Sequence, residues 1–102
     1  MAKLVALYKT PSDPTAFDAH YFSKHVPLAK TISGLQRYQV SAGPVATPQG
    51  ASPYYLAAIL SFDSMDSLQQ ALSSPEGKAT ASDLANFAQA GVELLVFDTK
   101  DV

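Results

Sequence analysis

Four stretches of the chain have the residue spacing of β-strands, in which successive side chains point to opposite faces of a sheet. Three of them are largely apolar, and the other alternates, with Tyr38, Val40 and Ala42 on one face. Prolines, glycines and small polar residues separate the stretches, as expected of turns and loops. The predicted strands are Lys3–Lys9, Leu35–Ala42, Tyr54–Phe62 and Val92–Asp98.

A first helix is predicted from about Pro14 to about Thr31. Asp13 before Pro14 is typical of an N-cap followed by proline at the first helical position. An apolar stripe follows at helical spacing. Its members are Phe17, Tyr21, His25 and Leu28.

A second helical stretch begins near Asp63 and Ser64 and carries Leu68 and Leu72 on one face. The segment 73–77 interrupts it, and Ser74 followed by Pro75 predicts the start of a further helix there. Between the second and third strands, residues 43–53 contain three prolines and two glycines, so we predict a loop without secondary structure.

The predicted order is strand, helix, strand, strand, helix, strand. Two such β-α-β units form an α+β, ferredoxin-like fold, in which the helices lie on one face of a four-stranded antiparallel sheet. An antiparallel sheet with one face in water should alternate apolar and polar residues, yet both faces of the strand 54–62 are apolar. Because no element remains to cover the second face, we predict a homodimer whose two sheets pack face to face.

Composition narrows the possible functions. The chain has 102 residues, which suits one domain spanning 1–102. Its net charge is -2 and it has no run of basic residues, which argues against nucleic-acid binding. It has no cysteine, which excludes disulfides, thiolate metal sites and a cysteine nucleophile. No apolar run approaches the roughly 20 residues of a membrane span, and we expect a soluble cytoplasmic protein.

The two histidines of the chain, His20 and His25, lie in the first helix, and Pro27 follows closely. Five residues apart on an α-helix, they would point roughly 140° away from each other, which makes them a poor metal pair and places His20 in solvent. Pro27 offers no N–H to the carbonyl of Ser23 and crowds it, so the helix should bend or change its turn there. Such a bend could open a gap between helix and sheet in which His25 meets a ligand; a histidine that serves only packing is the alternative.

Other polar residues have simpler interpretations. Tyrosines on strands usually serve packing, and an aspartate at or in a helix usually caps it or is solvated. The residues alone therefore favour packing for four tyrosines and capping or solvation for three aspartates: Tyr8, Tyr38, Tyr54 and Tyr55, and Asp63, Asp66 and Asp83.

Several segments together resemble the EthD family: Tyr21 with His25, Pro27 and Leu28, then Gly34 with Leu35 and Tyr38, and the Ser74-Pro75-Glu76-Gly77 break. The likeness extends over nearly the whole chain. It implies a dimeric α/β barrel, in which ferredoxin-like sheets of two copies close on each other. The family is named after a gene for bacterial degradation of ethyl tert-butyl ether, and related barrels include monooxygenases, cyclases and isomerases that work without a tightly bound organic cofactor.

The resemblance implies a site centred on His25 and Tyr21, with Phe17, Leu28 and Tyr38 in contact with a small hydrophobic or aromatic substrate. Two functions remain open. In one, neutral His25 acts as general base or acid in an oxidoreductase-like or isomerase-like reaction, and Tyr21 orients it. In the other, the protein binds a metabolite or assists a partner oxygenase without catalysis. Haem ligation by His25 is a weaker third option.

Overall fold

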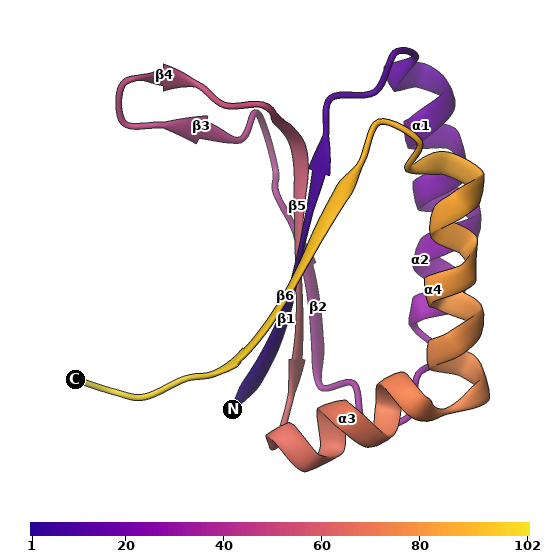
Figure 1. Ribbon diagram of the computed structural model, residues 1–102, viewed down its shortest axis with the longest axis vertical. Coiled ribbons are helices and arrows are strands. Elements are labelled where there is room, and N and C mark those ends of the chain that lie inside the picture. The colour runs from indigo at the N-terminus through magenta and orange to yellow at the C-terminus, as the bar shows by residue number, and fades with distance from the viewer.

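The computed structural model describes residues 1–102 and contains one four-stranded sheet with helices on one side (Figure 1). The strand order in the sheet is β2-β5-β1-β6, and all neighbouring strands are antiparallel. The ferredoxin-like prediction is therefore confirmed. The four strands are β1 (Ala2–Lys9), β2 (Arg37–Val40), β5 (Tyr54–Phe62) and β6 (Val92–Asp98).

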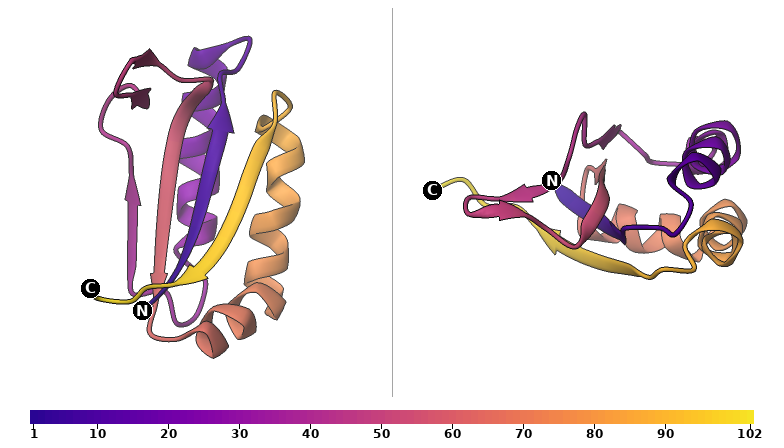
Figure 2. Two further views of the ribbon diagram at one scale, coloured as in Figure 1. Left: turned by 60° about the vertical axis from the view of Figure 1, so that its left-hand side comes forward. Right: turned by 90° about the horizontal axis from the view of Figure 1, so that it is seen from above.

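The helical layer has two parts, one from each β-α-β unit, and both cover the same face of the sheet (Figure 2). The first part is one continuous coil that changes its winding: α1 (Pro14–His20), the π-helix η1 (Tyr21–His25) and α2 (Val26–Ala29). The second part consists of α3 (Met65–Ser73) and α4 (Pro75–Phe87). No helix is both long and apolar enough to cross a membrane.

The turn between α3 and α4 is tight. Ser74 caps α4 by accepting a hydrogen bond from the amide of Gly77 at 3.1 Å, and its own hydroxyl donates to the carbonyl of Ala71 at 2.6 Å. A Cβ on Gly77 would lie 2.0 Å from that carbonyl oxygen. The predicted new helix start at Ser74 and Pro75 is thus confirmed, and glycine is needed at position 77 because the two helices meet there.

The two faces of the sheet differ in cover. Leu4, Ala6 and Tyr8 of β1 lie on the helix side and are buried. On the other side, Val5 pairs with Ile59 of one neighbouring strand and Leu95 of the other. Ile59 and Leu95 are exposed, as is the nearby Phe97. The second face is therefore apolar and uncovered in the single chain, as the sequence predicted.

The predicted loop 43–53 contains a short hairpin of β3 (Ala46–Thr47) and β4 (Gly50–Ala51), which corrects the expectation of no secondary structure. Each strand has only two residues, too few for a periodic pattern. The hairpin and the segment after β6 both project from the sheet on the side opposite the helices (Figure 1).

Candidate functional site

The π-helix places both histidines on one side of the first helical part. In this turn the amide of Val26 donates to the carbonyl of Tyr21, five residues earlier, so residues five apart return to the same side. Pro27 follows at once and has no N–H whose bond the wider turn could disrupt. The predicted separation of His20 and His25 by roughly 140° assumed α-helical winding, and it is wrong for this reason.

Both histidines contact one carboxylate, that of Asp83 on α4. His25 Nδ1 lies 2.9 Å from Asp83 Oδ2, and His20 Nε2 lies 3.0 Å from each carboxylate oxygen. The side-chain amide of Asn86 donates to Oδ1 at 2.9 Å. The sequence suggested that Asp83 caps a helix or is solvated, and this interpretation is wrong. Asp83 instead joins the two helical parts through its bonds to both histidines.

These contacts fix the protonation of the cluster. Burial opposes the charge of Asp83, but hydrogen bonds from Asn86, His25 and His20 outweigh it and lower the pKa of Asp83 to about 2. An ionised carboxylate only accepts hydrogen bonds, so His25 carries its proton on Nδ1. Burial lowers the pKa of His25, and the positive charge of a protonated His20 acts in the same direction, while the bond to Asp83 opposes both. His25 is thus a neutral imidazole at pH 7.

A pair of phenols lies beside the histidine. The hydroxyls of Tyr21 and Tyr38 are 2.6 Å apart, so one donates to the other. Burial raises the pKa of both groups, which therefore stay protonated. If Tyr21 is the donor within the pair, Tyr38 keeps its own proton for another acceptor.

Aromatic rings hold these groups in place. The ring of Phe87 lies 4.7 Å from that of His25 and stacks on His20 at 5.1 Å. Phe17 stacks on Tyr21 at 5.7 Å and is buried. The rotamers of both histidines are thus restricted by packing as well as by Asp83.

A cavity of about 70 Å³ lies between the helices and the sheet, and most of its lining is apolar. His25, Tyr8 and Tyr38 contribute polar groups to it. The bond to Asp83 uses Nδ1 of His25, and Nε2 makes no hydrogen bond within the chain. The lining also includes Leu94 of β6, which is exposed, so the cavity reaches the surface beside that edge strand. The arrangement offers a ligand one unprotonated nitrogen and two phenols in apolar surroundings.

The residues predicted for the site have different positions. His25 and Tyr38 line the cavity. Tyr21 is outside the lining and is hydrogen-bonded to Tyr38. Phe17 is part of the aromatic packing, and Leu28 is partly exposed and outside the lining, so neither contacts the cavity.

Sequence reasoning missed two residues. Asp83 is 58 positions from His25 in the chain, and no spacing rule connects them. Tyr8 was assigned to packing alone; the sequence signal was its parity with Leu4 and Ala6, which places the three side chains on one face of the strand. No group of three or more His, Cys, Asp or Glu side chains is arranged to hold a metal ion.

Comparison with known proteins identifies close relatives. An uncharacterized 11.0 kDa protein of Rhodococcus erythropolis, from the thcB-thcC intergenic region, is 43% identical over 100% of this chain and 98% of its own length. The crystal structure of an EthD family protein from Bacillus halodurans C-125 is 41% identical, covers 98% of this chain and 99% of that one, and superposes with a TM-score of 0.89.

More distant structures share the fold. A cofactor-independent oxygenase from Streptomyces nogalater, SnoaB, is 16% identical with a TM-score of 0.68, covering 99% of this chain and 94% of that one. A dimeric ferredoxin-like protein of unknown function from Thermobifida fusca is 17% identical with a TM-score of 0.70, covering 96% and 90%.

A family model describes the chain directly. The EthD domain matches residues 9–91, a range that includes both histidines, Asp83 and the tyrosine pair. Together with the two relatives above 40% identity, this match shows that the chain belongs to the EthD family.

Proposed function

We propose that this protein is an enzyme that binds a small apolar or aromatic metabolite in the cavity and moves a proton to or from it with His25. One observation carries the proposal. His25 is buried, is bonded through Nδ1 to an ionised carboxylate, makes no hydrogen bond through Nε2, and lines an apolar cavity. A neutral imidazole with an unpaired second nitrogen is the usual form of a histidine general base.

Asp83 supports proton transfer in two ways. Its bond to Nδ1 selects the tautomer with a lone pair on Nε2, and its negative charge stabilises the imidazolium that forms when Nε2 takes a proton. Removing a proton next to a carbonyl or from a phenol leaves a negative oxygen on the ligand. The protonated hydroxyl of Tyr38, which is hydrogen-bonded to Tyr21, lies in the cavity lining and can donate to that oxygen.

The size of the cavity limits the ligand. Its volume of about 70 Å³ is about half of the 150 Å³ that holds a benzene ring in an engineered protein cavity. A ring-sized substrate therefore extends from His25 toward the exposed Leu94, or displaces side chains there. Proton abstraction can begin an isomerisation or a cyclisation, and the resulting anion can also react with oxygen without an organic cofactor.

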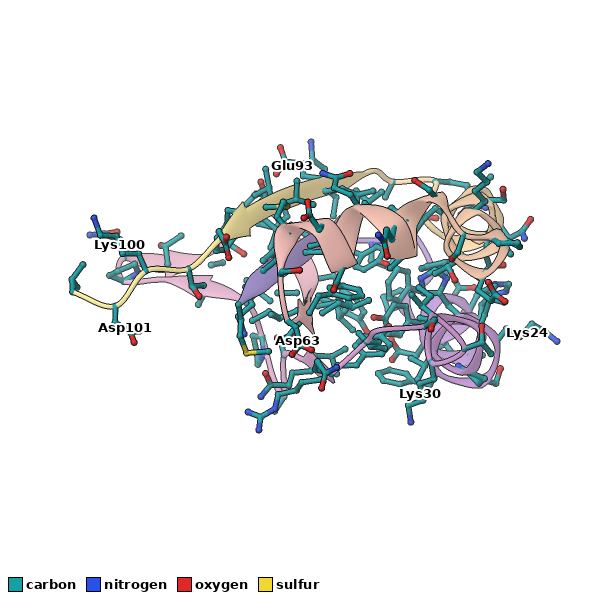
Figure 3. The ribbon with its side chains drawn as sticks, turned by 90° about the horizontal axis from the view of Figure 1, so that it is seen from below. Lys24, Lys30, Asp63, Glu93, Lys100 and Asp101 are labelled. Carbon is teal, nitrogen blue, oxygen red and sulfur yellow. The ribbon has the colours of Figure 1, made fainter.

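4-Nitrophenol provides a test, because it has one apolar ring, is weakly acidic, and only its anion absorbs visible light. We expect the wild type to bind it and raise its ionised fraction, and His25→Ala to lose this effect. Lys24→Ala is the matched control, since Lys24 precedes His25 but points away from the helical layer (Figure 3).

The outcomes separate the candidate functions. Binding without ionisation would favour a carrier that only holds its ligand. Unchanged binding and ionisation in His25→Ala would remove this residue from the site.

We also propose that a second copy of the chain covers the uncovered sheet face and completes a dimeric barrel. Ile59, Leu95 and Phe97 form the exposed apolar part of this face, and stable monomers rarely expose a patch of this kind.

Sedimentation of the wild type should give a dimer at micromolar concentration, and Leu95→Glu should give a monomer. Phe22→Glu is the matched control, because Phe22 is 50% exposed and Leu95 51%, but Phe22 lies in the helical layer. A monomeric wild type would contradict the proposal.

A further inference from the structure

Asp83 serves two histidines, although one would suffice to orient a base. Oδ2 accepts from Nδ1 of His25, and Nε2 of His20 contacts both oxygens. Asn86 completes the set at Oδ1. Because both histidine nitrogens contact the same Oδ2 at 3.0 and 2.9 Å, they are less than about 6 Å apart.

The two histidines differ in their access to solvent. The His25 side chain is 5% exposed and faces the internal cavity. The His20 side chain is 22% exposed and borders a polar groove on the outer surface with Asp13 and Gln89. A proton from solvent therefore reaches His20 without entering the cavity.

A single carboxylate stabilises one imidazolium well and a second one poorly. When one histidine of the pair is charged, Asp83 is neutralised and the second charge would meet a like charge less than about 6 Å away. A charge on one ring therefore opposes protonation of the other. The other titratable groups around His25 are the phenols of Tyr21, Tyr8 and Tyr38, which stay neutral because burial raises the pKa of each.

We propose that His20 is a positioning residue that takes the proton Asp83 can stabilise, and so keeps His25 neutral and available as a base when the solution becomes mildly acidic. This inference rests on the proposed role of His25 as a base. It gives a function to the π-helix, since only the wider turn brings both histidines to one carboxylate.

Imidazole nitrogen NMR on the ligand-free protein tests the inference across pH 4 to 9. In the wild type, His25 should stay neutral with its proton on Nδ1 while His20 takes the first proton. In His20→Gln, which keeps a donor to Asp83 but carries no charge, the midpoint of His25 should rise by about 0.5–2 pH units. This range follows from Coulomb's law for charges about 6 Å apart, between the dielectric of water and that of a protein surface.

Two further variants complete the experiment. His20→Phe keeps a ring against Phe87 and should raise the His25 midpoint as well, in case the glutamine disturbs folding. Lys24→Gln removes an exposed charge from the same turn and should leave the midpoint within about 0.2 units, because exposed charges are screened by solvent. An unchanged or lowered midpoint in both His20 variants would overturn the inference, as would a His25 that takes the first proton in the wild type. Neither result depends on nitrophenol binding, so the role of His25 as a base is judged separately.

Discussion

Each of the two helical parts has a proline near a change in its helical path, Pro27 in the first and Pro75 in the second, and the backbone differs at the two sites. Pro75 stands at the first position of α4, behind the N-cap Ser74, and simply starts a new helix in a new direction. Pro27 lies inside a coil that continues past it, and the change takes the form of the π-helix η1 before it. At Pro75 the chain changes direction between two helices. At Pro27 the coil continues, and the wider turn changes the side on which the following side chains lie.

A proline thus accompanies two different structures. The turn between α3 and α4, called the corner below, needs a cap at Ser74 and a glycine at position 77, and both can be recognised in the local sequence. The π-helix has no such cap, as no side chain bonds to its first amides. Its support comes from the other helical part, through the bonds of His20 and His25 to Asp83. We therefore expect the corner to be sensitive to steric change and the π-helix to electrostatic change.

The largest effect should come from Gly77→Ala at the corner. The added Cβ would lie 2.0 Å from the backbone oxygen of Ala71, so α3 and α4 must separate. We expect a loss of about 3 kcal/mol in the free energy of unfolding, measured by urea denaturation. Gly43→Ala is the control, since no atom lies within 4 Å of its Cβ position, and its loss should stay within about 0.5 kcal/mol. Equal losses for the two variants would show that the corner is not tight.

Removing the charge that joins the two parts should have the next largest effect. Asp83→Asn replaces a carboxylate that accepts from three side chains, and we expect a loss of about 2 kcal/mol in unfolding free energy. The midpoint of His25 should also fall, because the carboxylate raises it. Asp63→Asn, at an exposed position before α3, should change neither quantity appreciably.

Acid should remove the same contribution from the wild type. The folded pKa of Asp83 is about 2, below its ordinary 3.8, so its stabilisation is present above about pH 4 and is lost as the pH falls toward 2. We expect the stability difference between the wild type and Asp83→Asn to close over this interval, in urea denaturation at half-unit steps of pH. A difference that persists at pH 2 would show that the contribution is not electrostatic.

The smallest effect should follow from Tyr21→Phe, which removes one hydroxyl and keeps the ring that packs against Phe17. The loss of the bond to Tyr38 should cost about 1 kcal/mol in thermal or urea unfolding. A wild-type stability would mean that water replaces the lost partner in the cavity. Tyr55→Phe also removes one tyrosine hydroxyl, from a partly exposed bond to Asp18, and its change in unfolding free energy is the control for that of Tyr21→Phe.

The sequence predicted the sheet and its two apolar faces because strand and helix periodicities are local. It also predicted a disturbance at Pro27, since the lost N–H is a property of the residue itself. It did not predict that the disturbance is a π-helix, because the contacts that favour this turn come from α4. For the same reason, His20 was assigned to solvent and Asp83 to a helix surface. The central acid of the site belongs to the other β-α-β unit, and single-sequence spacing holds no information on such a pair.

The strand order has a consequence for the time course of folding. β1 is made first, but its neighbours β5 and β6 are among the last strands synthesised. A nascent chain therefore carries an apolar strand without a partner until residue 62 has left the ribosome, and one edge of that strand stays open until β6 follows. Pairings between such distant segments slow folding, and an unpaired apolar strand is prone to aggregation. Expression at low temperature or with chaperones should therefore raise the yield of folded protein more than changes in the helical layer would.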